Sequence, residues 1–134
     1  MILRIEHLGI AVKDSQKAKE LFALLLGAPS YKSETVESEK VNTTFFKVGE
    51  SKVELLESTD PAGPIGKFIE KRGEGIHHVA FEVDNIKEMM KQLKESGFQL
   101  LSDEPKKGAD NKLVCFLHPK STNGVLVELT QEIR

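Results

Sequence analysis

His7-Leu8-Gly9-Ile10-Ala11-Val12 returns 71 positions later as a closely similar stretch, His78-Val79-Ala80-Phe81-Glu82-Val83. A second pair of stretches, Val53-Glu54-Leu55 and Val127-Glu128-Leu129, lies 74 positions apart. A nearly constant offset along a chain of 134 residues indicates two copies of one supersecondary unit. Each copy carries a histidine in its first strand and a glutamate in its last.

Hydrophobic periodicity predicts the same order of elements in both copies, β-α-β-β-β. In the first copy we expect strands at about 3–12, 31–38, 42–49 and 52–58, with a helix from Asp14 to Gly27. In the second copy we expect strands at 76–83, 98–102, 112–118 and 124–130, with a helix from the Asp84-Asn85 cap to Gly97. The predicted fold class is α+β. Two tandem βαβββ modules would form a curved, barrel-like mixed sheet that lines a cleft, with the helices outside.

We expect residues 1–134 to form a single domain. Repeat one covers about 1–59, repeat two covers 75–134, and the Pro/Gly-rich segment at about 60–74 links them. Its stretch 65–71 has an amphipathic pattern. Each repeat alone, at about 65 residues, would bury only a marginal fraction of its surface, so a shared core is expected.

Composition excludes several classes of function. The net charge is −2 and no predicted helix carries a basic stripe, so nucleic-acid binding is not expected. No apolar run reaches the roughly 18 residues that a membrane span needs. The single Cys115 cannot form an internal disulfide, which favours a reducing compartment. The first residues lack the pattern of a secretory leader, and we therefore expect a cytoplasmic protein.

The repeated histidines and glutamates predict a metal site. His7, Glu54, His78 and Glu128 together offer two imidazoles and two carboxylates, a set that suits one divalent ion per chain: Co, Zn, Ni, Mn or Mg. Such an ion could take two further oxygens from a substrate and polarise a carbonyl. For Glu54 an alternative stays open, because strand alternation places Lys52 on the same face and the two could pair on an exposed surface.

The remaining polar residues have simpler interpretations. His77 should point away from His78 and is interpreted as structural, His118 is expected to pack in a loop, and Cys115 is expected to be a buried thiol. Three turn lysines, Lys106, Lys107 and Lys120, are candidates for contact with phosphates; the alternative is that they are only solvated.

At these residues the sequence resembles the vicinal oxygen chelate superfamily, and within it most of all the methylmalonyl-CoA epimerases. The resemblance lies in 7–12, 75–84, the loop 103–108 and the stretches 116–121 and 124–130. It implies a paired βαβββ fold around one metal, with His7, His78 and Glu128 as ligands and the fourth ligand at the position of Glu54. It also implies an acyl-CoA substrate and a homodimer.

The resemblance implies an isomerase that interconverts methylmalonyl-CoA epimers by α-proton abstraction and a metal-stabilised enolate. We expect Glu128 to be the first acid/base and Glu54 its partner on the opposite face. Some epimerases place a second catalytic glutamate in the third strand, but residues 41–45 contain none. The second base therefore stays open.

Two other functions compete with this one. The first alternative is a lactoylglutathione lyase, which resembles this chain in its metal and carboxylates. Two departures from the lyase pattern weigh against it: Ala11 stands where those enzymes carry an arginine, and His118-Pro119-Lys120-Ser121 replaces their turn before the last strand. A non-catalytic binding module of the same fold is disfavoured by the retained metal-ligand set.

Overall fold

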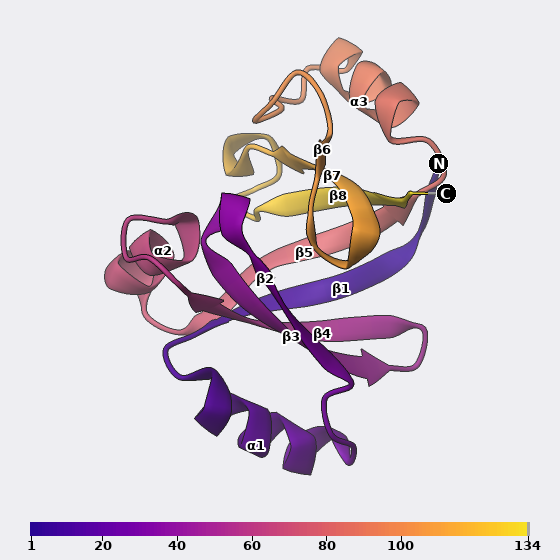
Figure 1. Cartoon of the computed structure of the whole chain (residues 1–134). Helices are drawn as coiled ribbons and strands as arrows, with labels where there is room; N and C mark the ends of the chain where they lie inside the picture. The colour runs from indigo at the N-terminus through magenta and orange to yellow at the C-terminus, as the bar shows by residue number, and fades with distance from the viewer. Residues whose placement is uncertain (134) are drawn as a thin grey trace. The chain divides into compact units, whose positions relative to one another are not determined.

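The computed structural model of the chain describes residues 1–133 (Figure 1). Its contacts divide the chain into two compact units. The unit His7–His77 is called the N-terminal unit below. The C-terminal unit combines Met1–Glu6 with the chain from His78 onward. The boundaries fall inside β1 (Ile2–Val12) and β5 (Gly75–Val83), so each of these strands contributes residues to both units.

In the N-terminal unit the strand order is β2-β3-β4-β1. β1 runs parallel to β4, whereas β3 is antiparallel to both β2 and β4. The elements after β1 are α1 (Ser15–Leu26), β2 (Lys32–Val36), the 3-10 helix η1 (Glu37–Glu39), β3 (Val41–Val48), β4 (Ser51–Ser58) and α2 (Pro64–Arg72). The predicted β-α-β-β-β order and the amphipathic segment of the linker are confirmed.

Helix α1 begins and ends where the sequence predicts. The Asp14 carboxylate accepts hydrogen bonds from the backbone N–H groups of Gln16 and Lys17 at the N-terminus. Gly27 adopts the left-handed conformation, with φ of 76°, that closes the C-terminus. The helix packs Phe22 against Phe46, with ring centroids 6.4 Å apart. This contact attaches α1 to one face of β3 and β4.

Helix α2 covers the other face of the N-terminal sheet at one end. Its Ile65 joins a buried cluster with Ala11, Val41 and Leu56. Gly66 approaches the preceding turn so closely that a Cβ atom would lie 2.6 Å from the carbonyl oxygen of Pro61. A residue without a side chain is therefore required where this helix leaves the linker.

In the C-terminal unit the strand order is β5-β8-β7-β6. β5 and β8 are parallel, and β7 is antiparallel to β8 and to β6. After β5 come α3 (Ile86–Glu95), β6 (Lys106–Lys107), the 3-10 helix η2 (Ala109–Asn111), β7 (Lys112–Leu117), the 3-10 helix η3 (Pro119–Ser121) and β8 (Val127–Glu132). Arg4 attaches the start of β1 to this unit through two hydrogen bonds of 3.2 Å to Glu82.

Two expected strands of the second repeat differ in the structure. The segment 98–102 is not a strand, because only the isolated bridge between Leu100 and Leu117 forms there. The edge strand forms instead at Lys106–Lys107, beyond Pro105, which has no N–H to donate to a ladder. The last strand begins at Val127 and not at 124, because the backbone N–H of Val125 bonds to the carbonyl of Thr122 and extends the turn.

The core of the C-terminal unit lies between α3 and the sheet. Asn85 caps α3 by accepting a hydrogen bond from the backbone N–H of Glu88. The core contains Val83, Ile86, Met90, Cys115 and Leu129. Within residues 1–133, no helix is both long enough and apolar enough to cross a membrane.

Candidate metal centre

His7 and Glu54 form a buried pair in the N-terminal unit. Gly9 lies directly opposite Glu54 in the parallel pair β1–β4, and His7, two residues earlier on β1, shares its face. His7 Nδ1 is 3.1 Å from Glu54 Oε2, and each residue is only 5% exposed. The alternative in which Glu54 lies on an exposed surface with Lys52 is therefore wrong.

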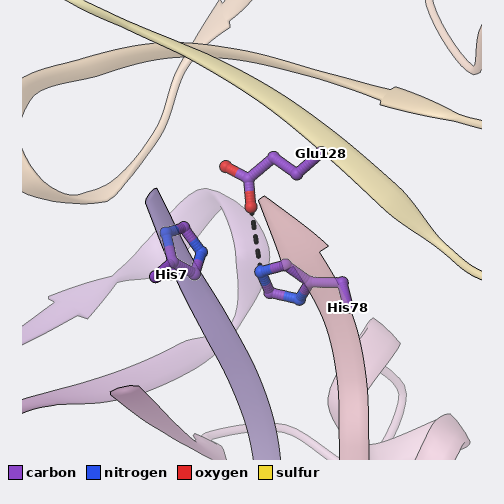
Figure 2. A group of neighbouring side chains, drawn as sticks. All are labelled: His7, His78 and Glu128. Atoms are coloured by element: carbon purple, nitrogen blue, oxygen red, sulfur yellow. Dashed lines mark ion pairs between the residues drawn. The ribbon is translucent and has the colours of Figure 1, made fainter. Parts of the chain in front are cut away.

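The C-terminal unit contains the second pair, His78 and Glu128. His78 comes from β5 and Glu128 from its parallel neighbour β8, and Figure 2 shows the imidazole and the carboxylate turned toward each other. His78 Nε2 is 2.9 Å from Glu128 Oε1, and both side chains are buried. The Phe116 ring lies edge-on to His78, with centroids 5.8 Å apart. The repeat thus places the same two residue types together twice.

The chemistry of these pairs fits a divalent ion. A buried carboxylate loses its hydration and needs a cation or several donors as compensation. Imidazole nitrogen and carboxylate oxygen are the ligand atoms that Zn²⁺ and related ions bind in proteins. The described residues thus include His/Glu groups able to hold a metal ion.

Each glutamate of the two pairs lies between a small residue and a phenylalanine. On the strand register Gly9, Glu54 and Phe45 are directly opposite one another in the N-terminal unit. Ala80, Glu128 and Phe116 are arranged in the same way in the C-terminal unit. We call these sets the N-row and the C-row. Each glutamate thus has a small residue as its neighbour on one strand and a phenylalanine as its neighbour on the other.

Sequence reasoning missed the two phenylalanines. Phe45 and Phe116 are 71 positions apart, which is also the offset between His7 and His78. A full alignment of the two repeats would therefore have found them.

The other singled-out residues lie elsewhere. His77 makes an edge-on contact with Phe68 of α2, with centroids 4.9 Å apart. His118 Nδ1 accepts the backbone N–H of Lys120 at 3.0 Å, which caps η3 and is a loop-packing role. Among the three lysines, Lys120 lies in η3, but Lys106 and Lys107 form β6 and not a turn, because they pair with Val114 and Leu113. All three are exposed.

Cys115 is buried, as predicted, with 1% of its surface exposed. Burial, and to a lesser extent the negative charge of Glu128, raises the pKa of the Cys115 thiol to about 11. The thiol is therefore neutral at physiological pH and is unsuited to act as a nucleophile.

Comparison with known proteins gives a consistent result. Residues 6–116 match the family model of the Glyoxalase/Bleomycin resistance protein/Dioxygenase superfamily. The chain is 41% identical to an ethylmalonyl-CoA/methylmalonyl-CoA epimerase of Cereibacter sphaeroides, over 98% of this chain and 99% of that protein. It is 40% identical to the mitochondrial methylmalonyl-CoA epimerase of Homo sapiens, over 96% of this chain and 73% of that protein.

A solved structure confirms the expected fold. A variant of Streptomyces coelicolor methylmalonyl-CoA epimerase, in complex with 2-nitronate-propionyl-CoA, has a TM-score of 0.95 to this structure at 33% identity. The match covers 98% of this chain and 96% of that one. Sequence, paired modules and three-dimensional similarity agree, and the chain belongs to the Glyoxalase/Bleomycin resistance protein/Dioxygenase superfamily, the vicinal oxygen chelate superfamily.

Proposed function

We propose that this protein is a metal-dependent epimerase that interconverts the two epimers of methylmalonyl-CoA. The observation that carries the proposal is the occurrence of a buried His–Glu pair at equivalent positions of both units, in a chain whose relatives include methylmalonyl-CoA epimerases. In this proposal His7, Glu54, His78 and Glu128 together hold one divalent ion: Co, Zn, Ni, Mn or Mg. The homodimer and the cytoplasmic location stay predictions from sequence.

The reaction requires removal of the hydrogen between the thioester and the carboxylate and its return on the other face. When bound, the divalent ion supplies stabilisation for the negative charge that develops on the substrate oxygens. Glu128 Oε accepts the proton on one face, and Glu54 delivers a proton to the opposite face. Both carboxylates are buried, which strengthens their electrostatic interactions.

The structure of the N-terminal unit also weighs against the lyase alternative. The family resemblance implies that Ala11 stands where glutathione-dependent lyases carry an arginine. Ala11 is completely buried, in an apolar cluster with Leu56 and Ile65 beneath α2. A position sealed in this way does not offer a cation to the carboxylates of glutathione.

The test is hydrogen exchange in deuterated water. The metal-loaded protein should exchange the α-hydrogen of methylmalonyl-CoA for deuterium and convert either epimer into the mixture without glutathione. The metal-free protein is the control and should regain activity when the ion is restored. Turnover of methylglyoxal with glutathione, in the absence of exchange on methylmalonyl-CoA, would instead support the lyase.

A further inference from the structure

A lysine extends the N-row by one residue. Lys32 of β2 lies directly opposite Phe45, which lies opposite Glu54. Residues that are directly opposite in neighbouring strands project from the same face of a sheet, with Cβ atoms about 4.5–5.5 Å apart. Lys32 therefore shares its face with Glu54 and is separated from it by one aromatic ring.

The ammonium group of Lys32 lies over that ring. Its Nζ atom is 4.7 Å from the centroid of Phe45, within the range of a cation–π contact. The ring is completely buried, so it provides a fixed support for a flexible side chain. Tyr31 lies beside it, with its ring centroid 6.0 Å from that of Phe45. This contact orients a positive charge at the end of the row that contains Glu54.

Lys32 forms an ion pair with Glu34, and part of its side chain stays exposed. Nζ is 3.8 Å from Glu34 Oε1, near the upper limit for an ion pair, and both side chains are 37% exposed. Pairs of this kind contribute little and are readily exchanged for another partner. The side chain of Lys32 is thus partly exposed to solvent, where an anion can approach it.

The C-row is not extended by a strand residue in the same way. β6 consists only of Lys106 and Lys107, which lie opposite Val114 and Leu113, so in the described part of the chain no strand residue continues the C-row beyond Phe116. The two rows thus share their carboxylate and ring, but a lysine lies directly in line only with the N-row, whereas Lys106 lies on the face of the C-row opposite Val114. A malonyl-type substrate offers such a lysine the anionic carboxylate next to its reacting carbon.

We propose that Lys32 is a specificity-determining residue that binds an anionic oxygen group of the acyl-CoA substrate. This inference rests on the proposed function. The anionic group is either the carboxylate next to the reacting carbon or a phosphate of the CoA moiety. In both cases Lys32 contributes to substrate binding and not to proton transfer.

The experiment compares three variants in the epimerase assay with the metal-loaded protein. K32M should raise KM for methylmalonyl-CoA by about 10-fold or more, the loss typical of a charge-assisted contact, with little change in kcat. K32R should restore most of the affinity. K19M removes an exposed lysine from α1 and should leave KM unchanged. Metal content, measured in parallel, should be equal in all variants.

A truncated substrate distinguishes the two sources of the anion. The N-acetylcysteamine thioester of methylmalonate keeps the carboxylate but has no phosphates. A K32M effect that persists with this thioester assigns the contact to the carboxylate, and an effect that disappears assigns it to the phosphates. The inference about Lys32 is wrong, and the proposed function stands, if the wild type is active and the KM of K32M is within 2-fold of the wild-type KM. The same holds if the KM of K32M is no higher than that of K19M. A wild type inactive on methylmalonyl-CoA would overturn the proposed function and this inference with it.

Discussion

The two units build the same His–Glu pair with different ring atoms and different neighbours. In the N-terminal unit His7 faces Glu54 through Nδ1, whereas in the C-terminal unit His78 faces Glu128 through Nε2. Phe45 is completely buried beneath Lys32, whereas Phe116 is partly exposed and lies edge-on to His78. The repeat therefore retains the donor types but not their surroundings, and the two glutamates should not be equivalent in function.

The strongest test of this comparison is the pair of substitutions Glu128→Gln and Glu54→Gln. An amide keeps an oxygen for a metal but is a very weak base. We expect Glu128→Gln to lower α-hydrogen exchange by about 10² to 10⁴, the effect of a lost acid/base group, with metal still bound. Glu54→Gln should lower exchange less, because Glu128 can still remove the α-hydrogen and return a deuteron on its own face. The assigned roles are reversed if Glu54→Gln abolishes exchange while Glu128→Gln keeps most of it.

Metal retention tests whether both pairs are ligands. His78→Ala should remove one ligand atom and weaken metal affinity by more than the roughly 10- to 100-fold typical for loss of a group that only orients a ligand, so metal content after dialysis should fall strongly. His118→Ala is the matched control, because that imidazole caps η3. Elemental analysis is the measurement, and undiminished metal in His78→Ala would contradict the site.

Helix α2 belongs to the N-terminal unit alone. A substitution of Gly66 tests how closely this helix must pack against the preceding turn. Alanine favours a helix over glycine by about 1 kcal/mol. Here, however, its Cβ would lie 2.6–2.9 Å from backbone atoms of Pro61, and overpacking of this kind costs about 1–3 kcal/mol. Gly66→Ala should therefore lower the free energy of unfolding in urea. An increase in stability would show that the turn can move aside.

Two substitutions compare the buried residues that follow the glutamates in the two units. Leu56 and Thr130 each lie two positions after their glutamate, 74 residues apart, and both are buried. The Thr130 hydroxyl has no hydrogen-bond partner within the described chain. Thr130→Val should therefore keep the free energy of unfolding or raise it by up to about 1 kcal/mol. Leu56→Thr, the matched control, should lower it, because it places a hydroxyl in an apolar cluster. A clear loss of stability in Thr130→Val would show that the hydroxyl is satisfied by water.

The smallest expected effect lies in the linker of the N-terminal unit. The backbone N–H of Ala62, together with the ammonium of Lys40 at 3.3 Å, lowers the pKa of Asp60. A carboxyl group whose pKa is lower in the folded state stabilises the fold above its unfolded pKa of about 3.9, and this stabilisation is lost as pH falls through the folded value. Asp60→Asn should therefore slightly reduce the difference between urea midpoints at pH 7 and pH 3. An unchanged difference would show that the ion pair has no net effect.

Local signals in the sequence predicted the helices, and the repeat singled out the two histidines and two glutamates that the structure places in buried pairs. Asp14, Gly27 and Asn85 are caps whose chemistry acts within a few residues, so their positions could be read directly. The edge strand at Lys106–Lys107 was missed, because pairing at an edge depends on a single neighbour, β7. Lys32 was missed for a related reason: it reaches the row of Glu54 only through the register of β3, which no local pattern reveals.

The burial of Cys115 has a practical consequence. As the chain's only thiol, enclosed by Met90, Leu129 and their neighbours in the described structure, it cannot meet a maleimide or disulfide reagent while the C-terminal unit is closed. The labelling rate of the native protein therefore reports how often this unit opens, in the manner of a slowly exchanging amide. Any ion or substrate that binds only the closed form must slow that rate in proportion to its occupancy. The labelling rate of Cys115 can therefore measure binding without an introduced probe.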